Sequence, residues 1–420
     1  MISLDEAQRY VLRDLEALAP VAVPLDDALD RVSAQVVEAR EAVPGFTNSA
    51  MDGYALRSDD TSAGPARLRV IGSVLAGDSP RPRLESGEAI RIMTGAPVPD
   101  GADCVCMIEE VTVRPRGDEI QVARALSHGE NIRLAGEDVA VGQVLVTPGS
   151  ELGPVLLGLV ASQGLDSLLV HPRPKVGVLS TGDELIDSRG SSVFGKIHDV
   201  NKRLLLASLC QSGFDTVDLG IARDDYDEIE KGLSRGIAEC DAVVSTGGVS
   251  VGDADHVKTV ITDRCSGRAR WMQIAIRPAK PFAFGLSESG TPVFGLPGNP
   301  VSTLVSFELF VRPALRLLAG HTALARPMVT AVLDCPIPRR RDGTIHFVHA
   351  FAEFHLDGHF HVVAAAPRGS HSLRAAANAN ILAMVEDGDG LVAGETVRAM
   401  ILNPAQPDPG RSNRFTLPLM

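Results

Sequence analysis

The sequence of 420 residues is poor in aromatic residues and carries no excess of basic ones. Aromatic residues make up 4% of the chain, so its apolar content of 45% leans on Val, Leu and Ala. The formal net charge of −13 argues against a broad nucleic-acid-binding surface, because phosphate backbones require a basic one. The charge does not exclude a small anionic ligand held by local cations.

Long hydrophobic runs and closely paired cysteines are also missing. No run is long enough to cross a bilayer, and no charged segment followed by an apolar one opens the chain, so we expect no membrane partner. The six cysteines include no Cys-x-x-Cys pair, which favours reduced structural thiols. Together these absences predict a cytoplasmic protein.

Length and hydrophobic pattern predict several domains. A chain of 420 residues exceeds the usual limit for one core, so roughly two to four domains are expected. Helical spacing predicts helices that begin after Ser3, span 25–39 and span 154–164, whereas short alternating runs fill 46–133. We divide the chain into a discontinuous N-terminal linker domain (1–43 and 134–172), an inserted β-rich module (44–133), a central α/β domain (173–322) and a C-terminal β domain (323–420).

The central domain holds three short apolar runs that each end in a glycine-rich polar loop. They read VGVLSTGDEL from Val176, DAVVSTGGVSVGDAD from Asp241 and TPVFGLPGNPVS from Thr291. Helical segments lie between and after them, the last over 301–318, so the pattern is βαβ with a mostly parallel sheet. Because the carboxyl ends of parallel strands meet at one edge, where ligands bind, we expect the three loops to share one cleft.

The first two loops are candidates for binding anionic oxygens. Glycine lets the backbone turn sharply after a buried strand and expose its amides, and neighbouring hydroxyls add donors. Taken alone, the first loop is better explained as an ordinary turn, but the second is richer. The candidate binding residues are Ser180, Thr181, Gly182, Thr246, Gly247, Gly248 and Ser250.

Three carboxylates follow strands of the same predicted sheet. These are Glu184, Asp224 and Asp255, whereas Asp253 fits a helix cap. Carboxylates crowded at one edge repel each other unless a hard cation lies among them, and Mg²⁺ with phosphate oxygens is the usual solution. The sequence therefore predicts a Mg²⁺ site here. The alternative is three separate solvated turns.

Two rigid loops complete the expected cleft. The segment Pro297, Gly298, Asn299 and Pro300 cannot continue a strand and must bend, so it is either simple architecture or a pocket wall. Arg277 and Lys280 place two cations on a constrained loop. Such a pair is a solvated turn or, beside a cleft, an oxyanion site.

The C-terminal histidines do not predict a metal site. A two-residue turn at Asp357-Gly358 would place His361 opposite Phe354 and leave His355 on the other face of the hairpin. Histidines on opposite faces cannot share one ion. We therefore expect no metal site formed by all five C-terminal histidines, which are His346, His349, His355, His359 and His361.

Taken in order, the motifs resemble those of the molybdopterin molybdenumtransferases, the MoeA-like family that includes the E domain of gephyrin. The resemblance covers nearly the whole chain. It rests on PGFTNSAMDGYA (44–55), IRIMTGAPVP (90–99), GENIRLAGEDV (129–139), STGDEL, NKRLL, GIARDD, STGGVSVGDAD, GLPGNPVS and GSHSL (369–373).

The resemblance implies a specific fold and activity. The family inserts molybdenum from molybdate into adenylylated molybdopterin, with release of AMP and participation of Mg²⁺. Its members are homodimers of multidomain α/β and β subunits. Each has a central MogA/MoaB-like α/β domain with a mostly parallel sheet, an inserted β-rich module that resembles a lid, an N-terminal helical and extended linker domain and a C-terminal β-barrel-like domain. Transient contact with a molybdopterin adenylyltransferase and with acceptor molybdoenzymes is implied as well.

The resemblance also assigns residues. Asp52, Thr94, Glu184, Asp224 and Asp255 match the family's functional acidic and hydroxyl positions, and Pro297 and Pro300 match its functional prolines. Arg277 and Lys280 match its basic pair, which with Ser370 would hold molybdate.

Two segments depart from the family pattern. The family's KPGKP reads RPAKP here, and Ala279 disfavours the positive φ that glycine would allow. Its GRxEFxR segment reads GTIHFVH, so Thr344 and His349 stand where arginines are expected. Arg339, Arg340 and Arg341 lie just upstream as substitutes for the missing cations.

Three other functions are compatible with parts of the pattern. A molybdopterin adenylyltransferase shares the central domain but needs neither end of the chain. A non-catalytic scaffold of gephyrin type keeps the fold, and the missing arginines suit it. A nucleotide-dependent dehydrogenase would need a Gly-x-Gly-x-x-Gly at a helix start after the first strand, which is absent. The sequence does not distinguish molybdate from tungstate as substrate.

Overall fold

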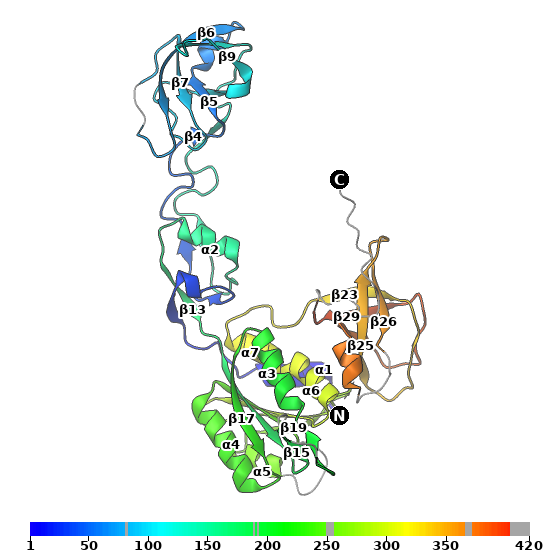
Figure 1. The fold of residues 1–420 in the computed structure, drawn as a ribbon. Coiled ribbons are helices and arrows are strands. Elements are labelled where there is room, and N and C mark those ends of the chain that lie inside the picture. Colours follow the sequence, from blue (N-terminus) through cyan, green and yellow to red (C-terminus); the bar gives the residue numbers. More distant parts are fainter. Residues whose placement is uncertain (80–82, 188–189, 191–192, 249–255, 366–371, 404–420) are drawn as a thin grey trace. The chain divides into compact units, whose positions relative to one another are not determined.

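The computed structural model describes residues 1–79, 83–187, 190, 193–248, 256–365 and 372–403. The chain falls into two compact units (Figure 1). The first comprises Met1–Val21, Asp30–Ala34 and Leu169–Met420, and the second comprises Ala22–Leu29 and Gln35–Leu168.

A six-stranded sheet forms the centre of the first unit. Its order is β17-β14-β18-β22-β21-β19, and the first four strands are parallel, as the sequence predicts. Strands β18 and β22 are buried at every position, which explains their continuous apolar runs. The bounds are β14 Lys175–Thr181, β17 Asp215–Ala222, β18 Ala242–Thr246, β19 Arg270–Gln273, β21 Pro281–Leu286 and β22 Pro292–Leu296.

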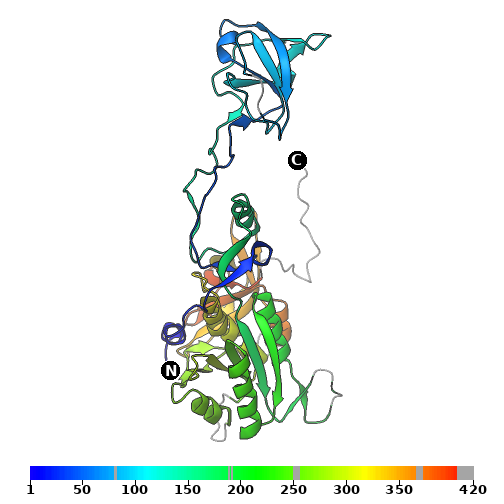
Figure 2. The ribbon, with the colours of Figure 1, turned by 90° about the vertical axis from the view of Figure 1, so that its left-hand side faces the viewer.

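Helices cover both faces of this sheet. One core cluster joins it to α4 and α5, and another joins it to α1, α3, α6 and α7. In both views the green helix α4 lies alongside the green strands (Figure 1, Figure 2). The bounds are α1 Leu4–Leu12, α3 Asn201–Gln211, α4 Tyr226–Glu239, α5 His256–Arg264, α6 Pro300–Ser306 and α7 Arg312–Leu318.

The first and the last of the predicted helices are present, and the last is irregular. The first begins after Ser3, whose hydroxyl accepts a hydrogen bond from the Glu6 amide (3.1 Å), so the predicted cap is confirmed. The last, expected to be regular, contains a π-helical segment η4 (Phe307–Val311) between α6 and α7. Pro313 has no amide hydrogen to donate, so the regular α pattern gives way before it.

The C-terminal part of the first unit is a closed barrel. Its strands follow the order β25-β26-β23-β29-β27, and β27 also pairs with β25. The short strand β20 (Ile276–Arg277) joins it in parallel with β25. The other elements are β23 Met328–Leu333, β24 Ile337–Pro338, β25 Ile345–Phe354, β26 Phe360–Ala364, α8 Leu373–Ala377, β27 Ile381–Val385, β28 Gly390–Leu391 and β29 Thr396–Ile401.

The predicted register of the β25–β26 hairpin is wrong. Phe354 pairs with Phe360, and His361 lies opposite Glu353 rather than Phe354. The amide of His355 donates to the carbonyl of His359 (2.9 Å), so the loop is longer than the predicted two residues. The rings of His355 and His361 therefore stack at 4.1 Å on one face. A change of one residue in register moves a side chain to the other face.

The second unit is built mostly from strands. Its largest sheet has the order β8-β5-β7-β6-β10-β9, which confirms the predicted β-rich character of this region. The bounds are β5 Gly53–Leu56, η2 Ser58–Thr61, β6 Ala66–Val74, β7 Glu88–Ile92, β8 Cys104–Met107, η3 Ile108–Glu110, β9 Val111–Val113 and β10 Glu119–Val122.

Smaller sheets complete the fold. They pair β4 (Asn48–Ser49) with β11 (Ile132–Arg133), β3 (Val37–Glu38) with β12 (Val144–Val146), and β15 (Leu185–Ile186) with β16 (Ile197–His198). A three-stranded sheet has the order β1-β13-β2, formed by Val21–Pro24, Ser167–His171 and Val32–Ser33. Helix α2 spans Pro154–Ala161, close to its predicted range. Among the described residues, no helix has the length and apolarity needed to span a membrane.

The helix predicted over 25–39 is wrong. Only Leu25–Asp27 is helical, as a 3₁₀ turn (η1), and β2 and β3 follow. Asp30 has a positive φ of 59°, which ends any helix at that point. The backbone groups of the two strands are paired with β13 and β12, so distant strands rather than local spacing decide the structure here.

Candidate functional site

The three glycine loops meet at one edge of the central sheet. Ser180 pairs with Thr246 across β14 and β18, and Thr246 pairs with Leu296 across β18 and β22. Because these strands are parallel and in register, the loops that follow them start side by side. The predicted gathering of the loops is confirmed for the described residues; Ser250 lies outside them.

Asn201 holds two of the loops together. Its Nδ2 donates to Thr246 Oγ1 (2.9 Å) and to the carbonyl oxygen of Gly298 (2.8 Å). Its Oδ1 is buried and has no hydrogen-bond partner among the described residues. Sequence reasoning did not select Asn201, although NKRLL belonged to the motif set; an Asn at the first position of a helix beside the loops was the available signal.

Gly247 allows the second loop to approach the first. Its φ is +99°, and a Cβ at this position would lie 2.3 Å from the carbonyl oxygen of Thr181. Any side chain would clash with this backbone atom. At Gly298, in contrast, the nearest atom to an added Cβ is the Cα of Gly247 at 3.8 Å, an ordinary contact distance. Only the first of these two glycines is required by close packing.

The Pro297–Pro300 bend uses its own polar groups. Asn299 Oδ1 accepts the amides of Val301 (3.0 Å) and Ser302 (3.3 Å), so it caps α6. The carbonyl oxygen of Pro297 accepts hydrogen bonds from Thr246 Oγ1 (3.2 Å) and Thr303 Oγ1 (2.6 Å). The bend is thus a rigid part of the strand edge, and its role in substrate binding stays a prediction.

Two of the three predicted carboxylates lie in neighbouring loops. The amide of Gly182 donates to the carbonyl of Ala222 (3.1 Å), and the amide of Asp224 donates to Asp183 Oδ1 (3.3 Å). The Glu184 carboxylate folds over Gly182, since a Cβ there would lie 2.6 Å from Glu184 Oε2. The first loop and the loop after β17 are therefore adjacent.

These loops offer oxygen donors to a hard cation. Glu184 and Asp224 are exposed, and Asp225 rather than Asp224 caps α4, by accepting the amides of Asp227 and Glu228. This donor set fits the chemistry of Mg²⁺. The third carboxylate, Asp255, lies outside the described residues, and within those residues no three metal-binding side chains form a group. The Mg²⁺ site stays a prediction.

A second feature of the first unit is a basic pocket of about 430 Å³. Arg277 of β20 lines it, whereas Lys280 does not, and Ser370 lies outside the described residues. The apolar part of the wall includes Phe347 and Val301. The charged and titratable lining residues are Arg277, Arg339, Arg340, Asp342, His346 and His349.

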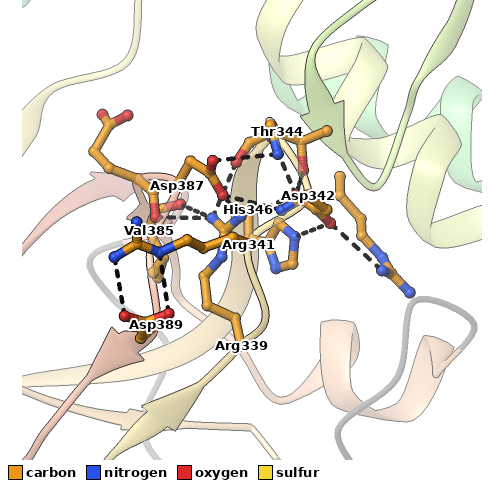
Figure 3. Close-up of polar contacts among 11 residues, drawn as sticks. Arg339, Arg341, Asp342, Thr344, His346, Val385, Asp387 and Asp389 are labelled. Carbon is orange, nitrogen blue, oxygen red and sulfur yellow. Dashed lines mark hydrogen bonds and ion pairs between the residues drawn. The ribbon is translucent and has the colours of Figure 1, made fainter.

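The three consecutive arginines have different environments, and Figure 3 shows the contacts of two of them, Arg339 and Arg341. The side chain of Arg339 is 1% exposed and donates to the carbonyl oxygens of Thr344, Val385 and Glu386. It also pairs with Asp342 (2.9 Å) and Asp387 (2.6 Å), so its charge is compensated. Arg341 pairs with Asp389 (3.0 Å) and lies outside the pocket. Arg340 is exposed and lines the pocket, so it is the candidate substitute for the missing cations.

Asp342 lies at the centre of the polar contacts beside the pocket (Figure 3). Its Oδ1 accepts the amide (3.1 Å) and hydroxyl (2.6 Å) of Thr344, and its Oδ2 lies 3.0 Å from His346 Nε2. Hydrogen bonds from Thr344 and from His346 hold the pKa of Asp342 well below its usual range. Sequence reasoning missed Asp342 and His346, because their role depends on a loop conformation.

Ala279 keeps a left-handed conformation despite its side chain. Its φ is +75°, and the residue is 3% exposed. The expectation that alanine disfavours a positive φ here is therefore wrong for this loop. Burial of its methyl group in the central core, which contributes about 0.8 kcal/mol, offsets part of the steric cost of this conformation, which is about 1–2 kcal/mol.

Asp52 and Thr94 lie together in the second unit. Asp52 Oδ1 accepts the amide (2.7 Å) and the hydroxyl (2.8 Å) of Thr94. These two hydrogen bonds, first that of the amide, lower the pKa of Asp52. The carboxylate is therefore ionised and held in one orientation. Their assignment to a functional site rests on the motif resemblance.

Known proteins are similar to this chain over nearly its whole length. One family model, the MoeA N-terminal region (domain I and II), matches residues 2–164, and another, a probable molybdopterin binding domain, matches residues 177–317. The molybdopterin molybdenumtransferase of Haemophilus influenzae is 36% identical over 94% of this chain and 98% of its own. Molybdopterin molybdenumtransferase 2 of Mycobacterium tuberculosis is 37% identical with the same coverage.

A solved structure is similar as well. The crystal structure of the molybdopterin biosynthesis MoeA protein from Pyrococcus horikoshii OT3 superposes with a TM-score of 0.81 at 30% sequence identity. The match covers 96% of this chain and 100% of that one. The predicted fold class, a multidomain protein of α/β and β domains with a mostly parallel central sheet and a C-terminal barrel, is confirmed.

Proposed function

This chain belongs to the molybdopterin molybdenumtransferases of the MoeA family, transferases of molybdenum cofactor biosynthesis, and from this premise we propose that it inserts molybdenum from molybdate into adenylylated molybdopterin with release of AMP. The full-length similarity favours this reaction over that of an adenylyltransferase, which needs only the central domain. The finer features of the proposal are the adenylylated substrate, the released AMP and a requirement for Mg²⁺.

One observation carries the proposal: the strand edge and the basic pocket are joined through the start of α6. Val301 lines the pocket, and its amide donates to Asn299 Oδ1 (3.0 Å). Two residues before Asn299, the carbonyl of Pro297 accepts the Thr246 hydroxyl at the strand edge. A nucleotide-linked pterin and an oxyanion would thus be held at two neighbouring places on one rigid element.

The strand edge has groups suited to adenylylated molybdopterin, and the basic pocket has groups suited to molybdate. At the strand edge, the amides of Gly182 and Gly247 already donate to the carbonyls of Ala222 and Leu296, so other amides of these loops would bind phosphate and pterin oxygens. The Oδ1 of Asn201, which has no partner among the described residues, is an acceptor for an N–H group. In the pocket, the planar fork of Arg277 and the cation of Arg340 suit a tetrahedral oxyanion such as molybdate.

Glu184, Asp224 and Asp255 would hold Mg²⁺ beside the phosphates. When bound, the ion supplies positive charge that offsets the negative charge on the phosphoanhydride as it breaks. The protein's own contribution is to fix the carboxylates: the Asp224 backbone is tied to Asp183, and Glu184 lies over Gly182. We also propose that the protein is a cytoplasmic homodimer in which Asp52 and Thr94 are functional, and light scattering would test the oligomeric state.

The test of this role is Asp224→Asn. We expect molybdate-dependent AMP release to fall roughly tenfold or more, with recovery as the Mg²⁺ concentration rises, because a ligand of the ion is weakened. Asp227→Asn is the matched control, since Asp227 is a nearby exposed carboxylate in the first turn of α4. Equal loss in both variants, or wild-type rates in Asp224→Asn, would contradict the assignment.

A further inference from the structure

Lys202 is a buried lysine in the first turn of α3, next to Asn201. Its side chain is only 4% exposed. Its Nζ lies 3.2 Å from Asp218 Oδ1 and 3.9 Å from Asp187 Oδ2. Burial of an ammonium group is unfavourable unless carboxylates compensate its charge. Since apolar side chains often stabilise such places equally well, stability alone does not explain why a charged residue lies here.

The two carboxylates belong to the segments that carry Glu184 and Asp224. Asp187 directly follows β15, which begins one residue after Glu184. Asp218 lies in β17, and the loop with Asp224 follows that strand. One ammonium group therefore joins the segment after the first loop to the strand that leads into the other loop.

Backbone contacts fix Lys202 relative to the first loop. The Ile197 amide donates to the carbonyl of Glu184 (2.8 Å). The Asp199 amide donates to the carbonyl of Ile186 (2.9 Å), and Asp199 Oδ1 accepts the amide of Lys202 (3.1 Å). The segment from β16 into α3 thus ties the lysine to β15 and to the backbone of Glu184.

The other carboxylate lies at an irregularity of β17. The pairing of β17 with β14 shifts by one residue between Asp218 and Gly220. Asp218 Oδ1 accepts the amide of Gly220 (2.8 Å), whose φ is +96°. Such an irregularity bends a strand and redirects the residues that follow it. Lys202 therefore holds β17 at the point that sets the course of the chain toward Asp224.

We propose that Lys202 is a positioning residue, which holds the loops of Glu184 and Asp224 at the spacing that one divalent cation between them requires. Without its positive charge, the carboxylates of Asp187 and Asp218 repel each other and the two segments move apart. The role of Lys202 is to place the ligands of the ion rather than to bind the ion. This inference rests on the Mg²⁺ site of the proposed function and adds a residue to it.

The test is Mn²⁺ binding to the full-length protein with AMP, followed by electron paramagnetic resonance and corrected by a titration of AMP alone. Mn²⁺ stands in for Mg²⁺, because both ions suit carboxylate and water oxygens. In Lys202→Met we expect Mn²⁺ to bind about tenfold more weakly, the usual effect of losing a group that orients metal ligands. The variant should fold, because the carboxylates that lose the ammonium group are 52% and 44% exposed and stay solvated.

The sign of the change separates positioning from charge. Loss of a nearby positive charge alone would make a cation bind more tightly, so equal or tighter Mn²⁺ binding in Lys202→Met overturns the proposal. Asp218→Asn removes a negative charge from the same contact and should also weaken binding; wild-type affinity in this variant contradicts the proposal too. Lys231→Met, at an exposed lysine of α4, is the matched control and should bind Mn²⁺ as the wild type does.

Two parallel measurements complete the test. Urea unfolding of Lys202→Met reports stability, and a loss of stability with unchanged Mn²⁺ affinity would show a purely structural role and overturn the proposal. Molybdate-dependent AMP release by the wild type, together with unchanged Mn²⁺ affinity in Lys202→Met, would leave the proposed function intact and remove only this inference. A wild type that binds no Mn²⁺ and releases AMP without added metal would remove the Mg²⁺ site and this inference with it.

Discussion

In this protein, the surroundings of a basic residue decide whether its side chain is available to a ligand. Arg339, Arg340 and Arg341 are consecutive, yet the Arg339 side chain is buried among carbonyl oxygens, Arg341 pairs with Asp389 outside the pocket, and Arg340 lines the pocket as an exposed cation. His346 and His349 are three residues apart on β25, yet among the described contacts only His346 pairs with a carboxylate. The sequence shows which cations are present, and the structure shows which are available.

The buried imidazole of His349 predicts a pH dependence of stability. Its pKa is about 4 in the folded protein against 6.5 as the ordinary value, so the unfolded chain binds the proton first as pH falls. The stability that the neutral imidazole contributes is present above pH 6.5 and is lost as pH falls through about 4, by up to about 3 kcal/mol.

Urea unfolding measured across that range checks this prediction. The wild-type free energy of unfolding should fall between ~pH 6.5 and ~pH 4, and His349→Gln should lack this part of the decrease. Asp342 does not confuse the result, because hydrogen bonds from Thr344 and His346 depress its pKa and its contribution is lost only at more acidic pH. Parallel curves for the two proteins would refute the role given to burial.

At the scale of elements, strands buried on both faces could be predicted from their apolar runs. Short strands that form only by pairing with distant segments could not. Strands β18 and β22 are covered on both faces, so their sequences are continuously apolar and could be recognised. Residues 25–39 have apolar residues at helical spacing, but pairing with β13 and β12 makes strands of Val32–Ser33 and Val37–Glu38 within them. The position of His355 was mispredicted for a related reason, since the length of a hairpin loop sets the register.

The close approach of the first and second loops gives an element-scale prediction. Gly247→Ala should destabilise the protein by about 2 kcal/mol or more, because the new Cβ would lie 2.3 Å from the Thr181 carbonyl oxygen at a positive φ. Gly298→Ala is the matched control and should be tolerated, since its Cβ finds the nearest atom at 3.8 Å. Thermal unfolding of both variants, with AMP release measured below their midpoints, decides this; equal effects would contradict the packing described here.

For the whole molecule, the fold and most of the strand edge could be predicted, but the pocket could not. The parallel order of the central strands follows from the βαβ pattern, and with it the meeting of Thr181, Thr246 and Pro297. The basic pocket combines residues from Arg277 to Ala375, and no local pattern signals that they meet. The resemblance to a family indicated Arg277, whereas Asp342 and His346 emerge only from the folded barrel.

The most direct test of the proposed activity uses the purified full-length protein with adenylylated molybdopterin, Mg²⁺ and molybdate. AMP and molybdenum cofactor are quantified in the same samples. We predict AMP release that requires molybdate and Mg²⁺ and that matches the cofactor formed, mole for mole. AMP released at the same rate without molybdate, or no AMP released in the complete mixture, would show that the strand edge and the basic pocket do not act together in molybdenum insertion.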